Sequence, residues 1–181
     1  MSPAEYEVLS AWIDTTFTAK HRVTGRVTNV VILDTTDSGD DRLLRDDNGQ
    51  SISWEKMTGT LRKRDPALQK GTLDAFRRAN THQALLRRSL HPSMNYVLVT
   101  SAQLEPIFCK GCGFWPEYYK RFPGSQGVLT ISGIGISPDG TQAFFYVSNI
   151  CEGLCGAGDY VVMEKQNGVW AIQNVIGMWV S

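Results

Sequence analysis

The chain has 181 residues, of which 42% are hydrophobic and 20% charged, and its 18 basic residues balance its 18 acidic ones. These proportions exclude a disordered or fibrous chain and indicate a folded globular protein with a core of ordinary size. The zero net charge gives the molecule no overall attraction to nucleic acid, so we expect no nucleic-acid partner. No apolar run approaches the roughly 18 to 20 residues of a membrane span, so we expect no span.

The N-terminal part predicts a helix followed by a buried strand. Ser2, Pro3 and Glu5 occupy the positions of a helix cap, a first-turn proline and a capping-box glutamate. Apolar residues then recur at helical spacing, which predicts a helix over residues 3–19. Residues 27–33 are rich in β-branched side chains and precede a cluster of turn-forming residues, so a strand followed by a loop is expected there.

The middle of the chain is less regular. Residues 42–70 carry many charges and a poor pattern, which predicts only a short strand or turn at 52–54. Two helices are predicted after this region, one over residues 72–80 with Thr72 as its cap and one over residues 81–90.

Proline positions divide the segment that follows. The helix over residues 81–90 should end at His91-Pro92, because the residue before a proline avoids the α region. A strand is predicted at residues 96–100 and a break at Glu105-Pro106. The aromatic run from Phe114 to near Phe122 then predicts another helix.

The last third of the chain predicts strands joined by tight turns. The expected strands are residues 128–136, 142–147, 160–165 and 170–178. The Pro138-Asp139-Gly140 and Asn167-Gly168 turns fix hairpin registers, so antiparallel pairing of successive strands is expected.

These elements predict a single α+β domain over residues 1–181. Its helical and loop-rich part is expected at residues 1–125 and a four-stranded antiparallel β-meander at residues 126–181. The open apolar face of the meander must be covered, and the helices at 3–19 and 72–90 are the cover that the chain offers. The nearest named shape is a cystatin-like or NTF2-like cone.

The C-terminal half resembles a family of uncharacterised, often exported bacterial proteins. The residues that carry the resemblance are Trp115-x2-Tyr118-Tyr119-x2-Phe122-Pro123-Gly124-Ser125-x-Gly127, Ser132-x2-Gly135, Ala143-x2-Tyr146-Val147, Cys151-x-Gly153-Leu154-Cys155-Gly156-x-Gly158-x-Tyr160 and Lys165-x2-Gly168-x-Trp170. The resemblance implies export but transfers no catalytic residue.

Four cysteines form two close pairs, Cys109-x2-Cys112 and Cys151-x3-Cys155. Disulfides are expected if the protein is exported, because oxidising compartments preserve them. Local bridges, Cys151 with Cys155 and Cys109 with Cys112, are the preferred pairing, and crossed bridges between the two motifs come next. The alternatives are a zinc site with all four thiolates as ligands, and free thiols.

The aromatic run offers the candidate ligand site of this sequence. Trp115, Tyr118 and Tyr119 recur at helical spacing, and packing in the core is the ordinary explanation. The alternative is an apolar ligand pocket between this helix and the sheet, where Glu117, Tyr118 or Tyr119 would supply polar contacts.

Two charged segments have opposite sign. Six aspartates lie within residues 34–47, and eight lysines and arginines lie within residues 61–90. Solvated faces with weak ion pairs explain both segments. The alternative is a basic patch for an anionic partner.

No recognisable set of acid, base and nucleophile is present, and we expect no cofactor. Our leading hypothesis is an exported bacterial binding or interaction module, non-enzymatic and stabilised by disulfides, that binds a protein or small molecule as a monomer or weak dimer. The alternatives are a small enzyme with its site on the concave face of the sheet, and a zinc-stabilised structural protein. A cytoplasmic location is the alternative to export.

Overall fold

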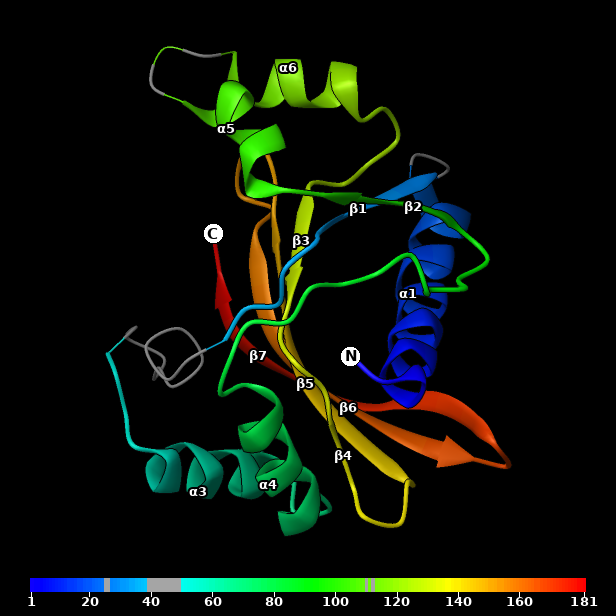
Figure 1. Ribbon diagram of the computed structural model, residues 1–181, viewed down its shortest axis with the longest axis vertical. Helices are drawn as coiled ribbons and strands as arrows, with labels where there is room; N and C mark the ends of the chain where they lie inside the picture. Colours follow the sequence, from blue (N-terminus) through cyan, green and yellow to red (C-terminus); the bar gives the residue numbers. More distant parts are fainter. Residues whose placement is uncertain (25–26, 39–49, 110, 112) are drawn as a thin grey trace.

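The computed structural model describes residues 1–24, 27–38, 50–109, 111 and 113–181. In these parts of the chain, a mixed sheet of seven strands lies between helices that cover both of its faces (Figure 1). The helices are α1 (Pro3–Thr24), α3 (Trp54–Arg64), α4 (Lys70–Ala79), α5 (Ser101–Phe108) and α6 (Phe114–Arg121). The strands are β1 (Asn29–Leu33), β2 (Asn95–Val99), β3 (Val128–Ile131), β4 (Gly135–Ile136), β5 (Gln142–Ile150), β6 (Ala157–Gln166) and β7 (Val169–Val180).

The strand order is β2-β1-β3-β5-β6-β7, and β4 adds a short pairing with β5. β1 is parallel to both β2 and β3, whereas β3, β5, β6 and β7 pair antiparallel in that order. The predicted α+β class is confirmed. The predicted four-stranded meander is wrong, because β1 and β2 extend the sheet beyond β3.

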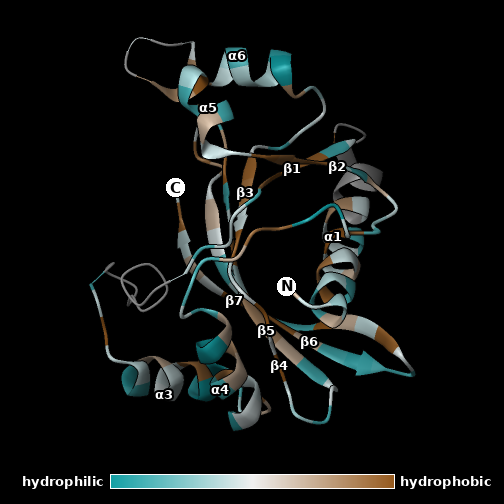
Figure 2. Ribbon diagram, in the orientation of Figure 1, coloured by the Kyte–Doolittle hydropathy of each residue, from teal (hydrophilic) through white to brown (hydrophobic). Residues whose placement is uncertain are grey.

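β1 has the composition of an inner strand. Val30, Val31 and Ile32 are all buried, so this strand contacts apolar groups on both faces of the sheet. Such continuous burial is typical of the parallel part of a sheet. Figure 2 shows the corresponding hydrophobic colours along β1 and β3.

The first face of the sheet is covered by α1, as the helical spacing over residues 3–19 predicts. Leu9, Ile13 and Phe17 of α1 are buried in one cluster with Phe145 of β5 and Val161 of β6. Burying each side chain of this size contributes about 1.5–3 kcal/mol to folding. This cluster is the largest of the three apolar clusters found among the described residues.

The second face is covered at one end by α3 and α4. The ring of Phe76 in α4 lies 4.9 Å from that of Phe144 and 6.1 Å from that of Tyr160, measured between centroids. α4 approaches the sheet closely because Gly135 has no side chain: a Cβ at this position would collide with the helix backbone at Thr72 and Phe76.

Two buried amides hold the ends of α4. At the N-terminal end, Gln142 Oε1 accepts hydrogen bonds from Gln69 N at 2.8 Å and from Thr72 Oγ1 at 3.0 Å. At the C-terminal end, Asn80 Nδ2 donates to Gly133 O at 3.0 Å, and Asn80 Oδ1 accepts from Gly133 N at 2.7 Å. The predicted capping role of Thr72 is therefore wrong, since Thr72 lies inside the helix and Gln69 is its N-cap.

The other end of the second face is covered by α5 and α6. Tyr118 of α6 is fully buried against Val31, Val99 and Val128 of the sheet. The helix predicted from the aromatic run is confirmed. The cover of the sheet thus differs from the prediction, which placed helices on one face only.

Two helices contradict the predictions for their segments. The expected strand or turn at 52–54 is wrong, because Ser53 caps α3 by accepting a hydrogen bond from the helix backbone. The expected break at Glu105-Pro106 is also wrong, since both residues lie inside α5. Thr100 and Gln103 form a reciprocal capping box at the start of α5, which favours the helix in spite of the proline.

Residues 81–90 are extended instead of helical. Ala84 N donates to Thr36 Oγ1 at 2.9 Å and Leu86 N donates to Asp34 O at 2.7 Å, so this segment lies beside the residues that follow β1. Leu86 and Leu90 are buried in the cluster under α1. Tertiary hydrogen bonds and burial therefore replace the helix that local propensity favours.

The C-terminal turns agree with the sequence. Asn167 and Gly168 have φ angles of 51° and 83°, the left-handed values that a two-residue hairpin between β6 and β7 requires. The predicted strand over residues 128–136 is divided into β3 and β4, because the backbone at Gly133 binds Asn80. No helix in the described ranges combines the length and the hydrophobicity needed to cross a membrane.

Candidate ligand-binding groove

The aromatic run of α6 packs as a cluster of rings. Tyr118 is fully buried and its hydroxyl donates to Gly127 O at 2.7 Å. Trp115 and Tyr119 are half-buried and stack with their centroids 5.8 Å apart. Glu117 is exposed and pairs with Lys120 at 3.2 Å. The predicted ligand pocket at these residues stays a prediction.

Burial raises the pKa of Tyr118 to about 12. The phenol therefore remains protonated at neutral pH and acts as a hydrogen-bond donor to Gly127 O. In this position Tyr118 joins α6 to the start of β3, which is a structural role.

The predicted bridge between Cys151 and Cys155 is confirmed, with a Cα–Cα distance of 5.7 Å. This bridge rules out the zinc site of four thiolates, the crossed pairing and the free thiols at these two positions. Cys109 is also disulfide-bonded, whereas its expected partner Cys112 lies outside the described residues.

Replacing both Cys151 and Cys155 by serine is expected to lower the free energy of unfolding by about 2 kcal/mol, because a bridge closing a short loop restricts the unfolded chain by roughly that amount. The bridged residues are four positions apart. Urea denaturation of the variant and the parent protein, without reductant, measures the difference. An unchanged free energy would show that the bridge adds no stability.

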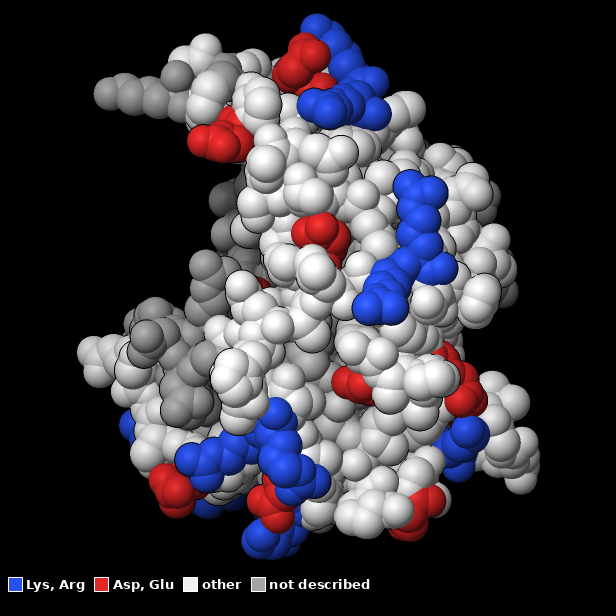
Figure 3. Space-filling view, in the orientation of Figure 1, with Lys and Arg blue, Asp and Glu red and all other residues white. Residues whose placement is uncertain are grey.

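The charged segment over residues 61–90 contains both signs in the folded protein. Basic side chains gather over α3 and α4 with acidic side chains among them (Figure 3). Lys70 pairs with Asp74 at 2.5 Å on the exposed side of α4. These observations agree with a solvated face.

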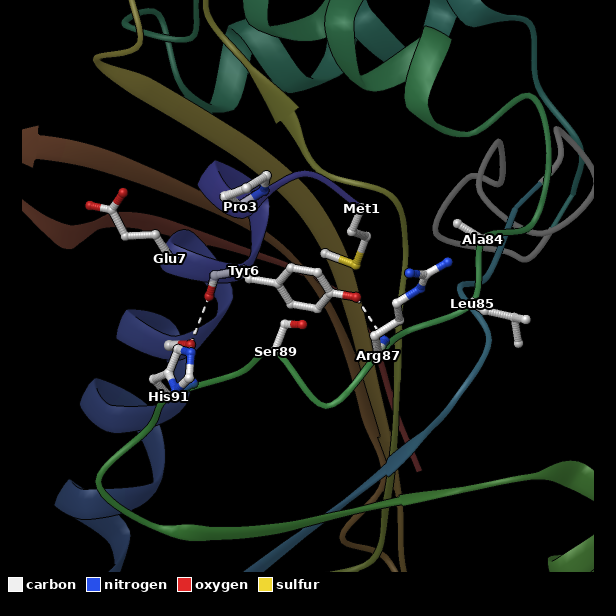
Figure 4. Close-up of a pocket in the computed structure, with 10 residues that line it drawn as sticks. Met1, Pro3, Tyr6, Glu7, Ala84, Leu85, Arg87, Ser89 and His91 are labelled. Atoms are coloured by element: carbon white, nitrogen blue, oxygen red, sulfur yellow. Dashed lines mark hydrogen bonds between the residues drawn. The ribbon is translucent and has the colours of Figure 1, made fainter.

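A groove of about 760 Å³ lies between the first turns of α1 and the extended segment at residues 84–91. Figure 4 shows the ring of Tyr6 in the middle of the groove, with Leu85 and Arg87 on one side and Glu7 and His91 on the other. This volume falls in the range of small-molecule sites.

Hydrogen bonds to α1 fix the position of the extended segment at residues 84–91, which we call the wall of the groove. The Tyr6 hydroxyl accepts a hydrogen bond from Arg87 N at 2.7 Å. Ser10 Oγ accepts from His91 N at 3.0 Å and donates to Tyr6 O at 2.7 Å. Because the backbone of the wall is bound at both Arg87 and His91, the groove exists before any ligand arrives (Figure 4).

The groove is lined by both apolar and basic residues. Pro3 and Leu85 supply exposed apolar surface, and Leu85 is 65% exposed. Arg87 and His91 are exposed, and no described carboxylate lies within ion-pair distance of the Arg87 guanidinium.

The acidic residue of the groove is already paired. Glu7 Oε1 accepts a hydrogen bond from Lys165 Nζ at 3.0 Å, and this ammonium also lies 5.3 Å from the Trp170 ring. In Figure 4 the Glu7 carboxylate points away from Arg87. The unpaired charge inside the groove is therefore positive.

Metal ligands do not gather in the described part of the chain, where no three His, Cys, Asp or Glu side chains are close enough to hold an ion. Neither a family model, nor a curated protein, nor a solved structure matches the chain. The cystatin-like or NTF2-like shape and the resemblance to exported bacterial proteins stay predictions.

Sequence reasoning missed the groove because its wall was assigned to a helix over residues 81–90. Asn80 and Thr81 are turn-forming residues, and they are the signal that separates the wall from α4. Tyr6 is one of the apolar residues that recur at helical spacing in α1, and it is buried, but its hydrogen bond to Arg87 has no signal in the sequence.

Proposed function

We propose that the protein is an exported, non-enzymatic binding module that holds a small amphipathic anion in the groove between α1 and residues 84–91. The observation that carries this proposal is the Arg87 guanidinium, which lacks an acidic partner among the described residues and stands beside an apolar wall. A carboxylate or phosphate is the usual partner of such a guanidinium.

The apolar surface of the groove matches the other end of such a ligand. Pro3 is exposed, and Leu85 offers a side chain that is 65% exposed. Covering these groups with an alkyl or aromatic tail removes apolar surface from water, which favours binding by about 25 cal/mol per Å². The anionic head then lies within reach of Arg87, which lines the groove beside Leu85.

The rigid wall reduces the cost of binding. Hydrogen bonds to Tyr6 and Ser10 hold the backbone of the wall. The buried side chains of Leu86 and Leu90 anchor the wall to the core. A ligand that enters a preformed groove loses less affinity to the ordering of loops. These contacts support a binding function.

Export is supported by the cysteine chemistry. The Cys151–Cys155 bridge is typical of oxidising compartments. The resemblance of the C-terminal half to often exported bacterial proteins points in the same direction. Localisation of the tagged chain in a bacterial host, by fractionation of periplasm and cytoplasm, tests this part of the proposal.

Titration with decanoate tests the ligand class. Decanoate is expected to bind in calorimetry, and Arg87→Gln is expected to weaken the binding by about tenfold, because losing a charge-assisted hydrogen bond costs about 1.5 kcal/mol. Arg88→Gln is the matched control, since Arg88 is the exposed neighbour that does not line the groove. The control variant should bind decanoate as the parent does.

Two results would contradict the proposal. Equal affinities of Arg87→Gln and Arg88→Gln would show that the guanidinium does not contact the ligand. Binding of decyltrimethylammonium in preference to decanoate would show that the groove selects cations. In an NMR titration with decanoate, the amide signals of residues 84–91 are expected to shift, which would locate the ligand in the groove.

A further inference from the structure

One edge of the sheet is a long strand with a neighbour on one side only. β7, red in Figure 1, is the last strand in the order β2-β1-β3-β5-β6-β7, and within the described ranges no strand pairs with its outer side. β7 has 12 residues, whereas β2 at the opposite edge has five. The backbone groups on the outer side of an edge strand can pair with a strand of another chain.

The sequence of β7 lacks most of the usual protection of such an edge. Natural proteins protect edge strands with charged side chains, proline, bulges or short length. β7 contains neither a charged residue nor a proline, although its inner neighbour β6 carries Asp159, Glu164 and Lys165. Its pairing with β6 has two register shifts, which is the one protective device that it shares. Charge is therefore absent where it would keep two edges apart.

Side chains of β7 are open to solvent although the strand is mostly apolar. Val169 is 68% exposed and Val175 is 50% exposed, and Gln173 is exposed as well. Trp170 and Ile176 are buried, and they belong to the apolar clusters on the two opposite faces of the sheet. A strand added beyond β7 would therefore extend the sheet where both faces carry apolar residues, and its side chains would contact the exposed valines.

The C-terminal part of β7 already has a partner from α3. Arg64 Nη1 donates to Gly177 O at 3.1 Å, which is the one hydrogen bond from a side chain to the β7 backbone in the described parts of the chain. Asn174 Nδ2 donates to Asp65 Oδ2 at 3.2 Å, so the end of α3 lies beside the strand. Residues 169–176, which precede the contact at Gly177, keep their backbone free of such bonds.

We propose that residues 169–176 of β7 pair antiparallel with the same residues of a second copy of the chain, which joins two sheets into one. A two-fold axis between the strands places only uncharged side chains opposite one another, so no like charges meet. The same axis closes the edge of both molecules with one interface, and the assembly therefore stops at two chains.

Strand lengths favour this arrangement over a pairing of unlike edges. β2 has five residues, so the β2 of a second copy would leave most of β7 uncovered. Such a head-to-tail contact would also leave one free edge on every assembly and would continue into a fibre. The interface is separate from the groove, because none of the described residues that line the groove lies on β7.

Analytical ultracentrifugation tests the inference. At micromolar concentration the parent protein is expected to sediment as a dimer of about 40 kDa, twice the 20.1 kDa of the chain, and to dissociate on dilution. Gln173→Lys combined with Val175→Lys is expected to raise the dissociation constant at least about tenfold, because like charges then meet between the copies. Both side chains are exposed, so the variant monomer should fold, which circular dichroism checks.

A matched control adds the same two charges elsewhere. Asn95→Lys lies on β2 at the opposite edge, and Leu154→Lys replaces a residue that is 92% exposed between β5 and β6. The variant with both changes should keep the dissociation constant of the parent, and so should Arg87→Gln in the groove. Hydrogen exchange gives a readout without substitution: the amides of residues 169–176 should exchange more slowly at high protein concentration than at low, whereas those of β2 should not.

Three outcomes would overturn the inference. The first is a parent protein that stays monomeric at every concentration reached, which would leave β7 open or assign it to an extended peptide of another protein. The second is a dimer whose dissociation constant is the same for the β7 variant and the matched control. The third is protection of β2 amides at high concentration without protection of β7, which would place the contact at the opposite edge.

Discussion

Replacing Gly135 by alanine is expected to lower the free energy of unfolding by about 3 kcal/mol, at the upper end of the usual cost of overpacking. The added Cβ would meet the backbone of α4 at Thr72 and Phe76, and these backbone atoms cannot rotate away as a side chain can. For a protein of this size the melting temperature should fall by roughly 10 °C. Calorimetry and urea denaturation measure both quantities.

Gly59 provides the matched control for this substitution. Gly59 lies inside α3, and a Cβ at this position has no atom within 4 Å. Gly59→Ala should therefore raise the free energy of unfolding by about 1 kcal/mol, the difference in helix propensity between the two residues. An unchanged stability of Gly135→Ala would contradict the close contact between α4 and β4. A loss of stability in Gly59→Ala would instead contradict the open space beside Gly59.

Asn80→Ala is expected to lower the free energy of unfolding by about 3 kcal/mol, because it leaves buried backbone groups without partners. The Asn80 side chain donates to Gly133 O and Phe76 O and accepts from Gly133 N. The alanine variant removes all of these bonds at once. Gln83→Ala is the control, since Gln83 is an exposed amide close by in the chain and should change stability by less than about 0.5 kcal/mol.

Asn80→Asp separates the lost bonds from a general packing defect. A carboxylate at this position still accepts from Gly133 N, but when ionised it faces the two carbonyl groups that Asn80 Nδ2 binds. Only the protonated carboxyl can donate, so its pKa should be raised in the folded state. The free energy of unfolding of Asn80→Asp should therefore lie furthest below that of the parent at pH 7. The difference should become smaller as the pH falls to about 4, near the ordinary pKa of an aspartate. A deficit that does not change with pH would contradict the bonding scheme.

The sequence was most informative where local chemistry decides the structure. The Asn167-Gly168 turn has the left-handed angles that only such residues adopt readily, so the β6–β7 hairpin was predictable. The start of α1 was predictable for the same reason, because Ser2 and Glu5 bond each other's backbone. The bridge between Cys151 and Cys155 follows from their closeness in the chain.

Other elements depend on partners far away in the chain. Residues 81–90 contain leucines at helix-compatible positions, but Thr36 and Asp34 bind the backbone of this segment in an extended form. α3 shows a weak pattern because it buries only Met57 and Leu61 against the sheet. Its start could have been inferred from Ser53, which is a good capping residue.

Contacts between distant segments had no clear pattern in the sequence. Tyr6 and Arg87 come together because the wall of the groove is extended. Thr130 and Asp37 are 93 residues apart and meet because β1 lies beside β3. The parallel pairing of β1 is therefore the fact that most separates the observed fold from the predicted one.

That pairing has a consequence for the order in which the protein is made. β1 spans Asn29–Leu33, but its two neighbours are at Asn95–Val99 and Val128–Ile131. During synthesis both edges of β1 stay open until most of the chain has left the ribosome, and closing such distant contacts is slow. The centre of the sheet is thus completed only after β2 and β3 have been made, although β1 is among the first segments to be synthesised.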